Sequence, residues 1–142
     1  MKRERGKSTE ITFVHWCKSK GYYCIRLQVD SGRDYLTKRV PADYIVLTDT
    51  HTLFIELKEV NGDRFPFKNL RQHKKLHDIH YSSADNVLSI ILINFYDLNK
   101  LAVLPIHYYN SLYNGSKKSF ISINDIDNKY LTTWKHLKIN SF

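Results

Sequence analysis

Residues 41–58 read PADYIVLTDTHTLFIELK, and this stretch decides the fold. Two apolar runs flank a short polar turn, a pattern that predicts a β-hairpin. A turn centred between Asp49 and Thr50 sets the register, so that Asp43 lies opposite Glu56. The same register gives two further pairs, Ile45 with Phe54 and Leu47 with Thr52.

Side chains of a strand alternate between its two faces, so this register brings Asp43, Glu56 and Lys58 to one face. The other face is apolar and consists of Tyr44, Val46, Leu53, Ile55 and Leu57. Two carboxylates and an ammonium at the rim of a buried sheet indicate a site for a hard metal ion with a lysine beside it.

Mg²⁺ binds oxygen ligands and keeps several waters, so Asp43 and Glu56 together with substrate phosphate oxygens are a sufficient site. In phosphodiester hydrolysis such a metal lowers the pKa of a bound water and offsets charge on the phosphate. Lys58 would orient that water or stabilise the charge. The alternative is a surface ion-pair cluster, which residue types alone favour by a modest margin. The hairpin register, with Glu10 before it and Gln72 after it, favours the metal site.

The bulk composition suits one globular domain, residues 1–142, with 42% apolar residues. A formal net charge of +8 favours a polyanionic partner such as nucleic acid. The spacing of Cys17 and Cys24 matches no common zinc pattern, and we expect two reduced thiols. The longest apolar run, 87–95, is too short to cross a bilayer, and the amino terminus lacks the apolar core of a signal peptide. We therefore expect a soluble, cytoplasmic protein with no membrane partner.

Helical and strand patterns alternate along the chain, which predicts an α/β fold. A basic arm, 1–7, precedes the catalytic core, 8–106, and a Tyr-rich C-terminal segment, 107–142. Within these parts we expect helices at 8–21, 68–80 and 125–137, strands at 22–29, 87–95, 101–106 and 120–123, and an exposed turn at 30–34.

Pro-Xaa-Asp, followed after thirteen residues by Glu-Xaa-Lys at the end of an apolar strand, resembles the signature of the PD-(D/E)XK nuclease superfamily. Within it the chain most resembles archaeal-type Holliday junction resolvases of the Hjc kind. The likeness runs in order through Arg5-Gly6-Lys7-Ser8-Thr9-Glu10, Gly21 to Arg26, Ser31-Gly32, Pro41-Ala42-Asp43, Glu56-Leu57-Lys58, Gln72 and Leu104-Pro105-Ile106. Bacterial resolvases of the superfamily share the Phe65-Pro66 pair, but the His-Gln that follows in them reads His73-Lys74 here.

The resemblance implies a restriction-endonuclease-like core, in which a central mixed β-sheet is flanked by helices. It implies that Glu10, Asp43, Glu56 and the Leu57 backbone carbonyl hold Mg²⁺, with Mn²⁺ as a substitute, and that Lys58 acts at the scissile phosphate. It further implies a homodimer, Ser31 on a mobile loop that reaches this phosphate, and Gln72 supporting the site from the next helix.

Basic residues surround the expected site and would contact DNA phosphates. They are Lys2, Arg3, Arg5, Lys7, Arg33, Lys38, Arg39, Arg71, Lys74 and Lys75. His73, His77 and His80 have helical spacing that suits a transition metal, yet histidines on a basic helix more often meet solvent or phosphate.

The residues predict a divalent-metal-dependent phosphodiesterase, and the resemblance implies an endodeoxyribonuclease that resolves four-way DNA junctions by paired symmetric nicks, in a prokaryote or in a virus of one. One alternative is another nuclease of this fold that cuts duplex, flap or single-stranded DNA or RNA. A second alternative is a DNA-binding module without catalytic activity.

Overall fold

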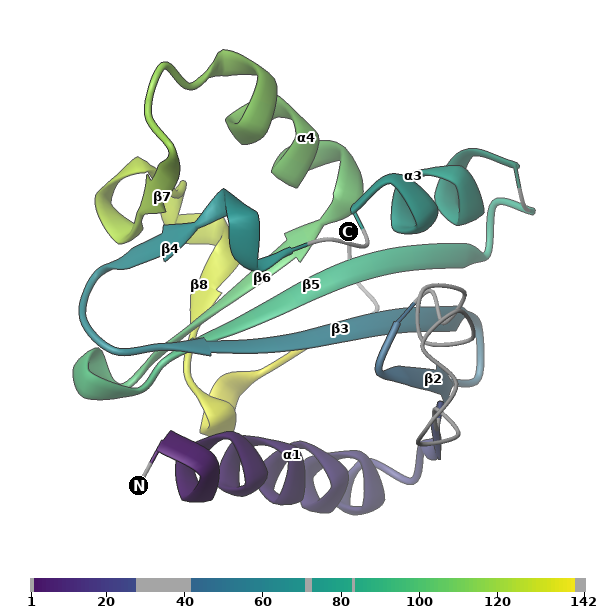
Figure 1. The fold of residues 1–142 in the computed structure, drawn as a ribbon. Coiled ribbons are helices and arrows are strands. Elements are labelled where there is room, and N and C mark those ends of the chain that lie inside the picture. Colours follow the sequence, from purple (N-terminus) through teal and green to yellow (C-terminus); the bar gives the residue numbers. More distant parts are fainter. Residues whose placement is uncertain (1, 28–41, 71–72, 83, 140–142) are drawn as a thin grey trace, which may run out of the picture.

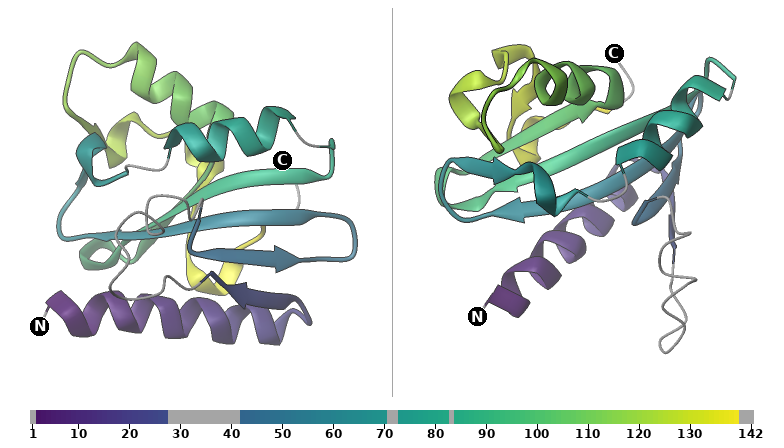
Figure 2. Two further views of the ribbon diagram at one scale, coloured as in Figure 1. Left: turned by 45° about the vertical axis from the view of Figure 1, so that its right-hand side comes forward. Right: turned by 45° about the horizontal axis from the view of Figure 1, so that its top comes forward.

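The protein folds into three layers, in which helix α1 covers one face of a β-sheet and helices α3 and α4 cover the other (Figure 1). The computed structural model describes the backbone of residues 2–27, 42–70, 73–82 and 84–139, and their side chains from Ser8 onward. In both views of Figure 2, α1 stays on the side of the sheet opposite α3 and α4. The helices are α1 (Lys2–Ser19), α3 (His73–Ser82) and α4 (Ile106–Gly115).

The central sheet has six strands in the order β1-β2-β3-β5-β6-β8. β3 and β5 run parallel and the other neighbours are antiparallel, so the sheet is mixed. Its strands are β1 (Tyr23–Arg26), β2 (Tyr44–Leu47), β3 (Thr52–Val60), β5 (Val87–Phe95), β6 (Lys100–Pro105) and β8 (Leu131–Thr132). A separate two-stranded sheet joins β4 (Arg64–Pro66) to β7 (Phe120–Ser122). The predicted α/β fold with a mixed central sheet flanked by helices is confirmed.

The predicted hairpin register is confirmed in β2 and β3, where Ile45 pairs with Phe54 and Leu47 with Thr52. The strand pairing ends at Tyr44 and Ile55, so the predicted pairing of Asp43 with Glu56 lies beyond it, and the backbone N–H of Asp43 donates to the Ile55 carbonyl at 3.0 Å. All five residues of the predicted apolar face are buried in the core beneath α1: Tyr44, Val46, Leu53, Ile55 and Leu57. The period-two pattern therefore assigned each face of the hairpin correctly.

Helix α1 packs on this core through Thr9, Phe13, Trp16 and Cys17, which share one helical face. Ile11 points away and is 49% exposed. The helix begins at Lys2 rather than at Ser8, so the predicted basic arm is helical. Lys, Arg and Glu favour helix, and the single Gly6 costs only about 1 kcal/mol. At the other end Gly21 takes φ +74°, and the Tyr22 N–H then reaches back to the Cys17 carbonyl at 3.0 Å.

The second core lies between the sheet and α3, α4 and the β4–β7 pair. Leu76 from α3 and Tyr109 from α4 are fully buried there against β5 and β6. The strand predicted at 87–95 matches β5 at both ends, and 101–106 matches β6 to within one residue. None of the described helices is long and apolar enough to cross a membrane.

The helix predicted at 68–80 is confirmed from His73 onward and is wrong over residues 68–70. A 3-10 turn, η1 (Phe67–Asn69), ends at Leu70, whose φ of −115° and ψ of 93° are extended, and α3 begins only at His73. Leu70 is 3% exposed, so burial of its side chain accounts for the interruption of the helical pattern.

The closing helix predicted at 125–137 is also wrong. This segment contains β8 between two 3-10 turns, η4 (Asn128–Tyr130) and η5 (Trp134–His136). β8 pairs with the free edge of β6, where Leu131 lies opposite Ala102. The Asp127 carboxylate accepts from the Lys129 N–H at 3.1 Å and caps η4. Two further 3-10 turns are η2 (Tyr96–Leu98) and η3 (Ile123–Asp125).

The strand predicted at 22–29 corresponds to β1 over residues 23–26, and its last two residues lie outside the described part of the chain, as does the whole turn predicted at 30–34. The short strand predicted at 120–123 corresponds to β7.

Candidate active site

Asp43 and Glu56 meet where β2 begins beside the middle of β3. Pairing of β2 with β3 starts at Tyr44, so the Leu57 N–H has no backbone partner from β2 at this point. The Asp43 carboxylate takes that place, and its Oδ2 accepts from the Leu57 N–H at 2.9 Å. In a strand the N–H and C=O of one residue point to the same side, so the Leu57 carbonyl is also directed toward Asp43.

Lys58 completes a group of three side chains on the polar face of the hairpin. Its Nζ lies 3.3 Å from Glu56 Oε2. The Glu56 side chain is 1% exposed and that of Lys58 is 26% exposed, so the pair lies at the boundary of the core and solvent. This arrangement holds one ammonium next to a carboxylate that is almost fully removed from water.

Burial raises the pKa of Glu56 to about 7, and the negative charge of Asp43 adds to this rise, while Lys58 opposes it. Burial also raises the pKa of Asp43, against the effects of the Leu57 N–H and of Lys58. Both carboxyls are therefore harder to ionise than exposed ones. A cation placed between them would favour the charged form of each.

Glu56 has a free ligand position in the part of the chain that the structure describes. Its Oε1 is buried and receives no hydrogen bond from any described residue. A buried carboxylate oxygen without a partner costs free energy, which a bound metal would recover. The donor set of two carboxylates and a backbone carbonyl is the type that Mg²⁺ binds. These residues fit a divalent cation.

Glu10 lies nearby but is held by other partners. Its Oε1 accepts from the Tyr44 hydroxyl at 3.2 Å and pairs with Arg26 Nη2 at 3.3 Å. Its negative charge adds to the rise in the pKa of Asp43. Among the described residues no three acidic, His or Cys side chains gather closely enough to share one ion. Glu10 thus lies near Asp43 and Glu56 but does not form a three-carboxylate cluster with them.

A chain of polar contacts fixes α1 next to the site. The Thr9 hydroxyl donates to Glu59 Oε1 at 2.8 Å and accepts from Asn94 Nδ2 at 3.1 Å. Thr9 is 6% exposed, so these bonds are shielded from water. They connect α1 to β3 and β5 one residue before Glu10.

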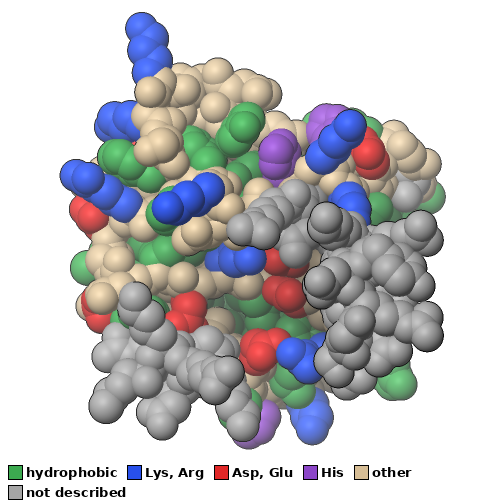
Figure 3. Space-filling view, viewed as in Figure 1, with side chains coloured by type: hydrophobic (Ala, Val, Ile, Leu, Met, Phe, Trp, Pro, Cys, Tyr) green, Lys and Arg blue, Asp and Glu red, His purple; other side chains and the backbone are tan. Residues whose placement is uncertain are grey.

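Acidic side chains gather over β3 and toward α1 in the space-filling view, with a few basic side chains at their edges (Figure 3). Further basic side chains are grouped above them, over β4, β7 and α4. The face that carries the candidate site is therefore acidic at its centre and basic around it.

Comparison with known protein families identifies the family of this chain. The family model of RecU, described as Recombination protein U, matches residues 6–140. The chain belongs to the Recombination protein U family. This is a family of Holliday junction resolvases, so the protein is placed among nucleases of recombination.

A solved structure shares the fold of this Recombination protein U family member. It is Hjc from Archaeoglobus fulgidus, a Holliday junction resolvase from an archaeal hyperthermophile, with a TM-score of 0.60 and 12% sequence identity over 84% of this chain and 89% of that chain. The likeness to the archaeal resolvase is thus one of fold, whereas the family of the sequence is Recombination protein U. No curated protein sequence matches this chain.

Several predicted site residues of this family member lie outside the described part of the chain. They are Ser31, Arg33, Lys38, Arg39, Arg71 and Gln72. Of the predicted basic arm, only the backbone of Lys2, Arg3, Arg5 and Lys7 is described, as the first turns of α1. Lys74 is exposed on α3, and Lys75 is half-buried with its Nζ out of contact with water.

Sequence reasoning missed Arg26 and Tyr44 as partners of Glu10. Both side chains are on the face of the sheet opposite to Glu56, because Arg26 pairs with Tyr44 in the register of β1 and β2. Neither residue is acidic, and nothing in the local sequence around either of them indicates a contact with Glu10. The pairing of β1 with β2 is the information that would have revealed Arg26.

The histidines of α3 make protein contacts rather than a metal cluster within the described residues. His77 Nδ1 lies 2.7 Å from Asn110 Nδ2, and His80 Nδ1 accepts from the Ser89 N–H at 3.4 Å. Burial lowers the pKa of His80, and the neighbouring His107 and His77 lower it further. These residues help join α3 to α4 and β5.

Proposed function

We propose that this protein is a Mg²⁺-dependent endodeoxyribonuclease that resolves four-way DNA junctions by paired symmetric nicks. The observation that carries the proposal is the group of Asp43, Glu56 and Lys58 in a member of the Recombination protein U family. A buried carboxylate pair with an unpartnered oxygen and an adjacent ammonium is the arrangement expected of the PD-(D/E)XK superfamily, to which we assign the fold.

In this proposal Asp43, Glu56 and the Leu57 carbonyl hold the divalent ion, and Glu10 supports it from α1. The ion, when bound, supplies a water of lowered pKa and offsets negative charge on the phosphate. Mn²⁺ is an expected substitute for Mg²⁺, since it accepts the same oxygen ligands.

Lys58 has the second role in the proposed reaction. Its ammonium is held within 3.3 Å of Glu56 and is one quarter exposed, so it can face a substrate phosphate while staying fixed to the site. There it would orient the attacking water and stabilise charge that develops on the phosphate oxygens. We assign supporting roles at the scissile phosphate to Ser31 and Gln72.

Paired nicks need two active sites related by two-fold symmetry, because a four-way junction is itself nearly two-fold symmetric. We therefore propose a homodimer, with residues 1–142 forming one nuclease domain in each subunit. The basic residues of the arm and of residues 33–39, together with Arg71 and Lys74, would contact the junction arms, whereas the buried Nζ of Lys75 would not. Because a prokaryotic chromosome lies in the cytoplasm, we expect the enzyme there.

The test is cleavage of a synthetic four-way junction and of its component duplexes, with Mg²⁺ or with EDTA. We expect nicks at symmetry-related positions on two opposing strands of the junction, only with Mg²⁺, and intact duplexes. Equal cutting of the duplexes would indicate a less selective nuclease of the same fold. Binding of the junction without cleavage at any pH would indicate a module without catalytic activity.

A further inference from the structure

A second basic surface lies on β4, η1, α4 and β7, and none of the residues that form it is assigned to the site above. We call it the β4–β7 surface and define it by four cations and three aromatic residues: Arg64, Lys68, Lys117, Lys118, Phe67, Tyr113 and Phe120. A groove of about 650 Å³ runs through it, lined by all of these except Lys117. Lys117 and Lys118 line an adjoining hollow of about 330 Å³.

An aromatic ring holds two of the four cations of this surface, Arg64 and Lys118, in place. The Arg64 guanidinium carbon lies 4.6 Å from the centre of the Phe120 ring, and Lys118 Nζ lies 5.6 Å from it. Phe67 packs edge-on against Tyr113, with ring centres 5.0 Å apart. A cation over an aromatic face loses less freedom when it binds an anion, because its position is already restricted.

The charge of the groove is not balanced by the residues that line it, although Asp125 lines the adjoining hollow. No carboxylate is among its lining residues in the described part of the chain. Arg64 has only a long contact with Asp63, 3.9 Å between Nε and Oδ1, and both side chains are more than half exposed. Within the same described ranges, neither Lys68 nor Lys118 forms an ion pair with an acidic side chain. An unbalanced cluster of this kind is stabilised by a polyanion.

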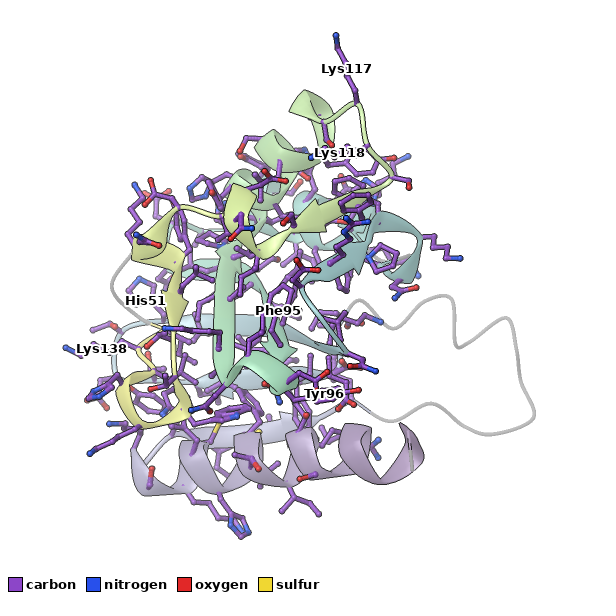
Figure 4. The ribbon with its side chains drawn as sticks, turned by 90° about the vertical axis from the view of Figure 1, so that its left-hand side faces the viewer. His51, Phe95, Tyr96, Lys117, Lys118 and Lys138 are labelled. Carbon is purple, nitrogen blue, oxygen red and sulfur yellow. The ribbon has the colours of Figure 1, made fainter. Side chains whose placement is uncertain are left out.

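The β4–β7 surface and the candidate site occupy the same face of the molecule. In Figure 3 basic side chains over β4, β7 and α4 stand above the acidic centre, on the side of the viewer. β4 follows β3 after a short turn, so only five residues separate Lys58 from Arg64. Figure 4 shows Lys117 and Lys118 at the α4 end of the molecule, whereas Lys138 lies on a different side.

We propose that the β4–β7 surface binds backbone phosphates of a duplex DNA arm that extends beyond the scissile phosphate. This rests on the proposed function only in that the site acts on DNA. Duplex is favoured over single-stranded DNA because Phe120 and Tyr113 already have partners, although Tyr113 keeps 42% of its surface exposed. Phe120 carries Arg64 and Lys118, and Tyr113 packs against His73 with centres 4.9 Å apart. Single-strand recognition needs open ring faces for bases, whereas phosphate contacts do not.

The test compares two triple variants of equal charge. The first is Arg64→Gln, Lys68→Gln and Lys118→Gln. The control is Lys129→Gln, Lys135→Gln and Lys138→Gln, which removes three cations near the C-terminal end and includes Lys129, held 5.1 Å from the centre of the Tyr130 ring. Both are measured with EDTA for equilibrium binding to a duplex, to a four-way junction and to a single strand over a range of salt concentrations.

Each phosphate contact on duplex DNA contributes about 0.9 to the slope of log affinity against log salt. We expect the first variant to lower that slope by about 3 on the duplex and the junction, and the control to lower it by less than about 1. Equal slopes in the two variants would overturn the proposal, and so would a loss confined to the single strand. Lys68→Gln alone, on an exposed side chain, should lower the slope by about 1 and excludes misfolding as the cause.

Junction cleavage by the unaltered protein separates this proposal from the proposed function. Cleavage with unchanged slopes would reject the β4–β7 surface and leave the nuclease assignment intact. No cleavage with a reduced slope in the first variant would reject the nuclease assignment and leave the DNA contact intact.

Discussion

The two faces of the hairpin formed by β2 and β3 differ in what they do for the protein, although they share one backbone. Toward α1, residues such as Val46, Leu53 and Ile55 are fully buried and stabilise the fold. Toward the other side, Asp43, Glu56 and Lys58 form a polar group in which the carboxyl pKa values are raised. One face contributes stability, and the other costs stability unless a cation is present.

Residues that stabilise the fold and residues of the candidate site therefore alternate along the two strands. Changes on the polar face should therefore remove activity and leave folding intact. Changes on the apolar face should reduce folding first.

The largest effect is expected for Asp43→Asn and Glu56→Gln. Each keeps the shape of the side chain and removes its charge, so metal binding is lost while packing is retained. We expect junction cleavage to fall by about 10³-fold or more and junction binding in EDTA to stay near that of the unaltered protein. Single-turnover cleavage rates give the measurement. A fall of less than tenfold in both variants would mean that these carboxylates do not hold the metal.

On the opposite face, Ile55→Ala should lower the free energy of unfolding by about 2–5 kcal/mol, because it opens a cavity in a fully buried position. Urea unfolding, followed by circular dichroism, measures this change. Asp43→Asn serves as the matched control, with an expected loss below about 1 kcal/mol. Similar losses in the two variants would remove the distinction between the faces.

The free energy of unfolding should depend on pH because the Glu56 carboxyl is buried on the polar face. A carboxyl with a pKa of about 7 when folded and about 4.5 when unfolded binds its proton more tightly in the folded state. Its contribution to stability is fully present below pH 4.5 and is lost as the pH rises to about 7. The loss is about 3 kcal/mol at 1.36 kcal/mol for each pKa unit.

Urea unfolding in EDTA between pH 4.5 and 8 tests this effect. Because other carboxyls titrate in the same range, the quantity of interest is the difference between the unaltered protein and Glu56→Gln. As the pH rises from 4.5 to 8, the unaltered protein should lose stability relative to Glu56→Gln. Parallel curves for the two proteins would show that Glu56 is not a buried, strained carboxyl.

The smallest effect is expected at the contact that joins α1 to the sheet. Thr9→Val keeps the size of the side chain and removes the bonds to Glu59 and Asn94. It should cost about 1–3 kcal/mol, since Glu59 and Asn94 lose a partner in a shielded position. Thr12→Val is the control, because the Thr12 hydroxyl bonds only to the Ser8 carbonyl of its own helix at an exposed position. Equal losses would argue against the role of Thr9 in placing α1.

The sequence alone was enough to predict the hairpin, its register and the shared face of Asp43, Glu56 and Lys58. The reason is that a period of two and a polar turn together leave one register that buries an apolar face. Strand β5 was equally clear, because its nine residues form one mostly apolar run that ends before the turn at 97–100.

The rest of the site depended on contacts between distant segments. Arg26 reaches Glu10 only because β1 pairs with β2, and no local pattern specifies that pairing. The C-terminal segment 125–137 was predicted as a helix, yet Leu131 and Thr132 form a strand that pairs with the free edge of β6. Tertiary pairing outweighed local preference in both places.

The central claim is that Asp43 and Glu56 hold a divalent cation on the polar face. Electron paramagnetic resonance of Mn²⁺ titrated into the protein tests it without relying on cleavage. We predict at least one bound Mn²⁺ ion per chain in the unaltered protein, displaced by excess Mg²⁺, and affinity at least tenfold weaker in Glu56→Gln. Equal Mn²⁺ affinity in the unaltered protein and in Glu56→Gln would contradict the account.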